Sequence, residues 1–241
     1  MNTNTASIQT SSSLQNHSGY VFLVILSMVY MSIMLCNSVL TNRYVGSSEL
    51  FVLGGTLTSP FVFILDDIIT EIYGYKIARA VILSGFTAQT IFTLICYIIT
   101  ISPQPDFFKE YNAYYNILGP SLMWINISGC IAYITANIIN SYVIARWKFL
   151  VKGKYFWLRS IGSSTFSEML YTFLAIIMME LNSIPLNDIL HVASISFAIK
   201  VTYSAIFACP ASLSVNYIKQ KTGIDVYEFP QIFTPFKYKS T

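Results

Sequence analysis

Residues 59–79 read SPFVFILDDIITEIYGYKIAR, and this stretch places three acids at the end of an apolar run. Asp67 and Glu71 are four residues apart, so on a helix they lie on one face. Two interpretations are open at this point. Either the acids are solvated at the end of a membrane helix, or they line a polar pocket within the protein.

The composition of the chain indicates a membrane protein. Of its 241 residues, 54% are hydrophobic and only 10% are charged, whereas soluble domains carry about 25% charged residues. The four cysteines form no C-x-x-C motif, so we expect no metal site and no cofactor. Residues 1–19 are polar and lack Lys and Arg, and we expect them to form a disordered N-terminal tail.

Six stretches are apolar enough, and at about 20 residues long enough, to cross a hydrocarbon core of about 30 Å. They are residues 20–40, 50–69, 78–101, 120–145, 160–179 and 190–218. The sequence therefore predicts an all-α, polytopic membrane protein with six transmembrane helices in residues 20–218. Residues 219–241 form a C-terminal tail in this interpretation.

The basic residues predict the orientation of the chain. The loops after the second, fourth and sixth stretches hold most of the 14 Lys and Arg residues. Because basic residues collect on the cytoplasmic side, we predict that both termini are inside. The basic loop at residues 146–159, RWKFLVKGKYFWLR, is interpreted as a topology determinant and headgroup anchor, not as a nucleic-acid site.

Polar residues recur along one face of the fourth stretch. Asn126, Tyr133, Asn137 and Asn140 share that face at 100° per residue. Such a stripe either hydrogen-bonds to neighbouring helices or faces the path of a solute. Both alternatives remain open.

The fifth and sixth stretches each bury an ionisable residue. Glu168 lies nine residues past Arg159, with Tyr171 beside it, and Lys200 lies well inside the last stretch. Charges at membrane depth are costly and mark a functional site by default. Lys200 either pairs with an acid of another helix or contacts a solute.

The sequence contains none of the motifs of a hydrolase or an ATPase. It has no phosphate-binding glycine loop, no nucleophile elbow and no H-E-x-x-H. We therefore predict that the protein is not an enzyme. The second stretch, in contrast, contains Gly54, Gly55 and Pro60, which weaken a helix, and interrupted spans are typical of transporters.

An ordered set of residues resembles a known family. Residues 60–79 resemble the D-x-x-x-E-x-Y-G-x-x-x-A-R signature of the VUT family, the queuosine precursor transporters or YhhQ-like proteins. The resemblance extends over residues 20–228 and includes the following positions: Asn140-Ser141-Tyr142, Lys152-Gly153-Lys154, Arg159, Gly162, Ser163, Lys200, Pro210, Ile224-Asp225 and Tyr227. Asp66 replaces an expected small hydroxyl residue, and Tyr171 replaces a usual aspartate.

The resemblance implies a multi-pass protein of the cell inner membrane that imports a queuosine precursor of the 7-deazaguanine type, such as preQ0 or preQ1. The alternative is a binding subunit for another vitamin-like or nucleobase-like solute, energised by a separate partner. A homodimer is left open. The predicted solute-binding residues are Asp67, Glu71, Asn137, Asn140, Glu168, Tyr171 and Lys200.

The six predicted spans also suggest a hypothesis about symmetry. Two halves of three spans each would be inverted repeats, and the second and fifth spans would then correspond. Those two spans carry Asp67, Glu71 and Glu168, and corresponding interrupted segments are a pointer to a transport site.

Overall fold

The computed structural model describes the chain except residues 1–2, 48–50, 104, 106–108, 181–184 and 228–241. The side chains of residues 3–17, 109–113 and 115 also lie outside the description. The described elements are α1 (Thr3–Leu40), β1 (Tyr44–Gly46), β2 (Phe51–Leu53), α2 (Gly55–Tyr73), α3 (Tyr75–Ile101), α4 (Lys109–Leu150), α5 (Phe156–Glu180) and α6 (Leu186–Thr222).

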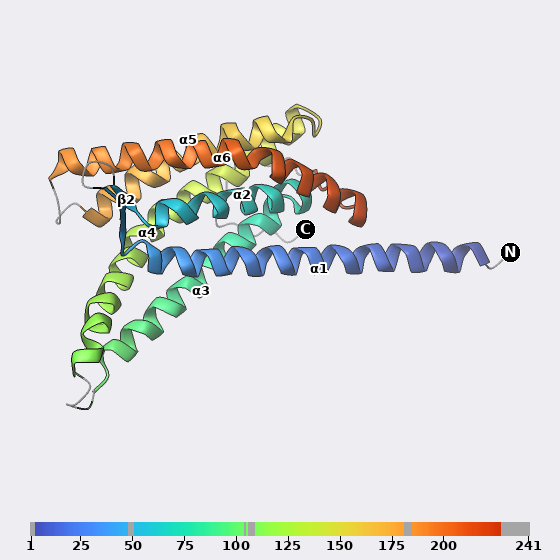
Figure 1. The fold of residues 1–241 in the computed structure, drawn as a ribbon. Coiled ribbons are helices and arrows are strands. Elements are labelled where there is room, and N and C mark those ends of the chain that lie inside the picture. Colours follow the sequence, from blue (N-terminus) through green and yellow to red (C-terminus); the bar gives the residue numbers. More distant parts are fainter. Residues whose placement is uncertain (1–2, 48–50, 104, 106–108, 181–184, 228–241) are drawn as a thin grey trace.

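The shortest helix, α2, occupies the centre of the fold. It runs between α1 and α6 and packs against each of the other helices, α1, α3, α4, α5 and α6 (Figure 1). Most of its side chains are buried. α3 and the first part of α4 lean away from the other helices as a pair (Figure 1). The acids of residues 59–79 therefore lie inside a helical bundle.

Five of the described helices are long and apolar enough to cross a membrane: α1, α3, α4, α5 and α6. This confirms five of the six predicted spans at the level of length and composition. α2 is not among them, because Asp66, Asp67 and Glu71 interrupt its apolar character. A sixth span through α2, and the orientation with both termini inside, stay predictions.

The second span begins later than predicted. Residues Phe51–Leu53 pair with Tyr44–Gly46 as an antiparallel hairpin, with Val45 opposite Val52, so the helix starts at Gly55 instead of residue 50. The hairpin is a small departure from the all-α prediction. Pro60 does not break α2, which continues to Tyr73; Pro60 lies in the second turn, where its missing N–H removes a single helical hydrogen bond.

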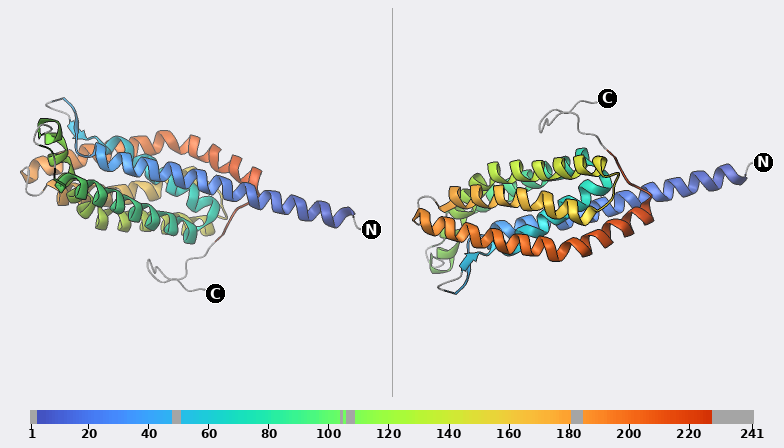
Figure 2. Two further views of the ribbon diagram at one scale, coloured as in Figure 1. Left: turned by 90° about the horizontal axis from the view of Figure 1, so that it is seen from below. Right: turned by 90° about the horizontal axis from the view of Figure 1, so that it is seen from above.

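The helix α1 begins at Thr3, within the segment expected to be a disordered tail, and projects beyond the other helices (Figure 2). The division into residues 1–19, 20–218 and 219–241 stays a prediction.

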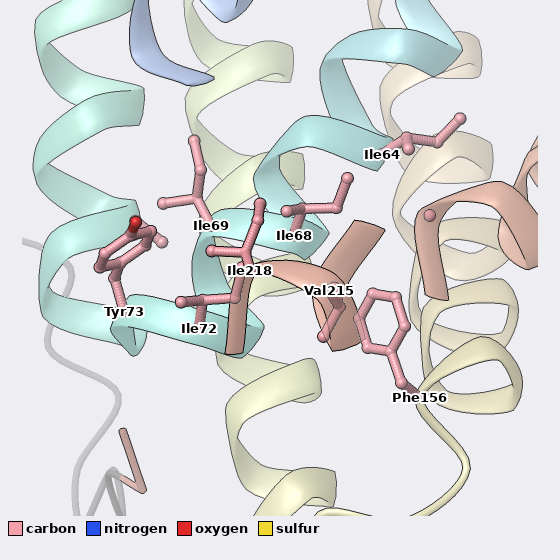
Figure 3. Packing of buried hydrophobic residues seen from close by; sticks show 10 residues of the cluster. Ile64, Ile68, Ile69, Ile72, Tyr73, Phe156, Val215 and Ile218 are labelled. Carbon is pink, nitrogen blue, oxygen red and sulfur yellow. The ribbon is translucent and has the colours of Figure 1, made fainter. Parts of the chain in front are cut away.

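Apolar packing fixes the C-terminal half of α2, which carries the three acids. Ile68 and Ile72 lie beside Val215 and Ile218 of α6 (Figure 3), and this contact holds the acid-bearing end of α2 against α6.

Close backbone contact joins the hairpin to α1. The N–H of Gly54 donates to the carbonyl oxygen of Arg43 at 2.6 Å. A Cβ atom on Gly54 would lie 2.5 Å from the carbonyl oxygen of Leu40, which is backbone and cannot turn aside. Glycine is required there for lack of space.

We expect Gly54→Ala to lower the free energy of unfolding by about 1–3 kcal/mol, the usual cost of overpacking. The measurement is the apparent Tm of the purified protein in detergent. Gly129→Ala is the matched control. Its added methyl group would meet nothing closer than Met179 Cε at 3.9 Å, so the change should be neutral or stabilising. Equal effects of the two variants would contradict the prediction.

Candidate functional site

The three acids of α2 are all enclosed by the bundle. Asp66 is 1% exposed, and Asp67 and Glu71 are fully buried. The interpretation that they are solvated at a helix end is therefore wrong. Their surroundings differ, however: Glu71 lies among cations, whereas Asp66 and Asp67 lie among neutral polar groups.

Glu71 lies in a cluster of opposite charges. Arg159 Nη1 donates to its Oε2 at 2.9 Å, and Lys219 Nζ donates to its Oε1 at 2.7 Å. Lys148 Nζ is 3.9 Å from Oε1 and donates to the backbone oxygen of Glu71 at 2.5 Å. Together with Asp225, these residues form what we call the basic-end ion cluster. It ties α2 to the ends of α4 and α6 and to the start of α5.

The segment after α6 completes this cluster. Asp225 Oδ1 accepts from Lys148 Nζ at 2.5 Å and lies 2.8 Å from Lys219 Nζ. The N–H of Val226 donates to the carbonyl oxygen of Ile72 at 3.1 Å. Lys148 Nζ also lies 4.5 Å from the ring centroid of Tyr227. The chain therefore folds back across the end of the bundle and covers the ion pairs.

Partial burial raises the pKa of Asp225, but the hydrogen bonds and positive charges of Lys148 and Lys219 outweigh it. The result is a pKa below the usual aspartate value. Asp225 is therefore ionised in the folded protein over a wider pH range than in the unfolded chain.

Asp66 and Asp67, the carboxylate pair, are surrounded by hydroxyl and amide groups. Asp67 accepts from Asn140 Nδ2 at 2.5 Å, from Ser164 Oγ at 3.0 Å and from Ser160 Oγ. Asp66 Oδ2 accepts from Ser141 Oγ at 2.8 Å and from Asn140 Nδ2 at 3.5 Å. No cation of the described part of the chain forms an ion pair with either acid.

Glu168 and Lys200 form a third polar group between α5 and α6. Glu168 Oε1 accepts from Ser204 Oγ at 3.0 Å, while Oε2 has no hydrogen-bond partner among the described residues. Lys200 Nζ donates to Thr172 Oγ1 at 2.9 Å and lies 4.6 Å from the ring centroid of Tyr171. Both charged side chains are buried.

Two adjoining cavities reach these residues. Each has a cavity volume of about 20 Å³. Both are lined by Asn37, Thr41, Ser59, Tyr171 and Met179. The first also contacts Phe63, Phe86, Gln89 and Tyr133, and the second contacts Thr172 and Lys200. Aromatic rings, hydroxyls and amides suit a flat polar solute.

The predicted site residues fall into separate groups. Asp67 and Asn140 lie together, as do Glu168, Tyr171 and Lys200, whereas Glu71 lies in the basic-end ion cluster. Asn137 donates to the backbone oxygen of Tyr133, and its Oδ1 has no partner among the described residues. Tyr171 and Lys200 are the predicted residues that line the cavities described above.

Sequence reasoning missed several residues of the site. Ser160 and Ser164, which donate to Asp67, are spaced by four, and that spacing was a usable signal. Asn37 and Ser59, on α1 and α2, line both cavities and gave no signal of their own. Lys148 and Lys219 were interpreted as surface charges because their partner Glu71 is far away in sequence.

A family model described as "putative vitamin uptake transporter" matches residues 53–215. The chain belongs to this family. No curated protein and no solved structure matches the chain. The match to the vitamin uptake transporter family covers all seven predicted solute-binding residues and stops before Lys219 and Asp225. Membership indicates a multi-pass membrane transporter for a small solute, in agreement with the prediction that it is not an enzyme.

We expect Glu71→Gln to destabilise this vitamin uptake transporter by about 3 kcal/mol, because it leaves buried cations uncompensated. The apparent Tm in detergent should fall by roughly 6–12 °C. Glu180→Gln is the matched control: this acid is half-buried at the other end of α5, and we expect little change. A Glu71→Gln variant as stable as the control would show that the ion cluster does not hold the fold.

The contribution of Asp225 should depend on pH. Its folded-state pKa lies below the unfolded value of about 3.9, so its stabilisation is complete above that pH and is lost as the pH falls through the folded-state pKa. The difference in Tm between the wild type and Asp225→Asn should be constant from pH 7 to about 5 and shrink below about pH 4. Asp188→Asn, at an exposed acid in the first turn of α6, should show no such trend. A difference that persists undiminished at pH 3 would contradict this assignment.

Proposed function

We propose that this chain imports a queuosine precursor of the 7-deazaguanine type across the cell inner membrane. The observation that carries the proposal is that Tyr171 and Lys200 line the cavities, while the buried acid Glu168 lies one turn before Thr172 of the second cavity on the same helix. Family membership supports transport of a small solute. The resemblance of residues 20–228 to queuosine precursor transporters supplies the chemical class.

The hydrogen-bonding groups of the solute match those of the site. A deazaguanine presents neighbouring N–H donors on its pairing edge, and a carboxylate accepts such donors as a pair. Glu168 offers Oε2, which has no partner in the described part of the chain. Lys200 Nζ can donate to the ring carbonyl oxygen. The carboxylate of Glu168 would thus accept from the N–H groups of the solute, while the ammonium group of Lys200 donates to its carbonyl group.

The flat ring of the solute requires an apolar face. Tyr171 contacts Phe63 at 5.9 Å and Tyr133 at 6.4 Å between ring centroids, and all three line the first cavity. Stacking of a planar solute on such rings contributes favourably beside the hydrogen bonds. Asn137, whose Oδ1 is unpartnered among the described residues, is a further acceptor for the solute.

The two cavities leave little open space between the side chains that line them. Entry of the solute therefore requires the helices to separate, as in alternating access. The basic-end ion cluster closes the end of the bundle opposite the hairpin. In this proposal the described conformation is closed at that end, and release of the solute requires these ion pairs to part.

We expect Glu168→Gln to reduce uptake of labelled precursor at least about tenfold, since a hydrogen bond to a charged group contributes about 1.5–3 kcal/mol. Uptake is measured in cells that cannot make the precursor, with membrane expression quantified in parallel. Glu180→Gln should transport normally. Normal uptake by Glu168→Gln would remove Glu168 from the site, and absence of uptake by the wild type would contradict the proposed solute.

The same transport assay in vesicles containing only the purified chain decides between the carrier and the partner-dependent alternative. Uptake without any other protein would establish a carrier that acts alone. Uptake that appears only with an ATP-hydrolysing partner would establish the binding subunit instead.

A further inference from the structure

The acids of one short helix differ in how their charge is compensated. Glu71 has three cationic side chains within 4 Å: Lys148, Arg159 and Lys219. Asp66 and Asp67, one turn earlier, have none among the described residues. Two adjacent buried carboxylates without a cation are unfavourable in a bilayer. The pair therefore lacks positive charge.

Hydrogen bonds are not what the pair lacks. Asp67 accepts on both of its oxygens, from Asn140, Ser160 and Ser164. Asp66 accepts from Ser141 and Asn140. In the described conformation these donors all point at the carboxylate oxygens of the pair. A metal ion can bind the outward lone pairs of these oxygens while the hydroxyl and amide groups stay in place.

The other ionisable groups nearby do not supply a cation. Tyr30 of α1, Tyr75 of α3 and Tyr133 of α4 lie within electrostatic range of Asp66, and a tyrosine carries no positive charge. Arg79 of α3 packs over the ring of Tyr75 at 5.8 Å. Further along α5 and α6, Lys200 donates to Thr172 instead. No cation of the described residues therefore pairs with Asp66 or Asp67.

The amide of Asn140 occupies the position between the two acids. Its Nδ2 lies 2.5 Å from Asp67 Oδ1 and 3.5 Å from Asp66 Oδ2. Asn140 is fully buried, and its Oδ1 has no hydrogen-bond partner in the described residues. A half-turn of this amide exchanges Nδ2 for Oδ1 and brings a neutral oxygen to the point on which both carboxylates converge.

From this geometry we propose that Asp66, Asp67 and Asn140 bind a sodium ion, with the hydroxyl oxygens of Ser141, Ser160 and Ser164 completing the oxygen shell. A half-turn of the Asn140 amide accompanies binding. The ligands are all oxygen atoms, which suits a hard cation. The site joins α2, α4 and α5, the helices that carry these six residues.

The composition of the site selects a monovalent metal ion. No group of three or more His, Cys, Asp or Glu side chains that could hold a metal exists in the described part of the chain. Transition metals prefer imidazole and thiolate ligands, and calcium takes 6–8 oxygens, several of them from carboxylates. The prediction of no metal site rested on the absence of a C-x-x-C motif, and that absence says nothing about a site built from oxygen ligands alone.

A bound sodium ion would energise uptake by moving inward with the solute. That purpose rests on the proposed transport function, but binding of the ion does not depend on which solute is carried. The test is therefore made without solute, so that a wrong solute and a wrong ion site give different results.

The experiment uses the purified full-length chain in detergent at constant pH and constant ionic strength. The apparent Tm is followed while NaCl replaces KCl, and binding of ²²Na⁺ is measured directly. We expect a saturable rise in Tm of about 5 °C with NaCl, and ²²Na⁺ displaced by NaCl but not by KCl. Asp67→Asn and the milder Ser164→Ala should each lower sodium affinity at least about tenfold.

Asp188→Asn is the matched control, because it removes an exposed acid by the same chemical change; its response to sodium should equal that of the wild type. Absence of displaceable ²²Na⁺ binding to the wild type overturns the proposal, even if Asp67→Asn fails to fold. Full sodium affinity in Ser164→Ala and Asp67→Asn also overturns it. A rise in Tm with CaCl₂ or on acidification, without one with NaCl, assigns a different ion and likewise overturns it.

Discussion

The fold depends on the enclosure of a helix that cannot face lipid. α2 carries three acids within six residues, and each ionised acid at membrane depth costs at least about 2.5–3.5 kcal/mol. α2 contacts all five of the other described helices. Apolar contacts such as Ile72 against Ile218 fix it in place (Figure 3). The apolar helices α1, α3, α4, α5 and α6 are thus arranged around a polar centre.

Inside this enclosure the charges are compensated in two ways. At the basic end, Glu71 is held by cations from three other helical segments and covered by the chain after α6. Removing one partner leaves a buried charge, so such a cluster is rigid until all its members part. The carboxylate pair, one turn deeper, is held by neutral hydroxyl and amide groups. Neutral partners can turn without leaving a charge behind, which suits a site that loads and unloads.

Sequence reasoning reached the parts of this arrangement that depend on local pattern. Span lengths followed from apolar runs, and the family followed from the motif around Asp67 and Glu71. The contacts of Lys148 with Asp225, and of Ser160 with Asp67, join residues 77 and 93 positions apart. Periodicity along one helix cannot show which face of another helix it meets, so these pairings were beyond prediction. The start of α2 was misplaced because the hairpin register of Phe51–Leu53 depends on Tyr44–Gly46.

Helix α5 connects the proposed ion site to the proposed solute site. Ser160, Ser164, Glu168 and Thr172 follow one another at intervals of four residues. Each interval turns the direction of the side chain by about 40°, because four residues exceed one turn of 3.6. The stripe therefore rotates by about 120° along the helix. Its first two members donate to Asp67 of α2, and its last two contact Ser204 and Lys200 of α6.

This stripe provides a physical route for coupling. A sodium ion bound as proposed would draw Asp67, Ser160 and Ser164 together and so fix the rotation of α5, and the same rotation would set the position of Glu168 and Thr172 against α6. A solute held by Glu168 and Lys200 acts on that rotation from the other end. If both ligands favour one setting of a rigid helix, each raises the affinity for the other by the same factor. Coupling then requires no contact between ion and solute, only that α5 turns as a unit.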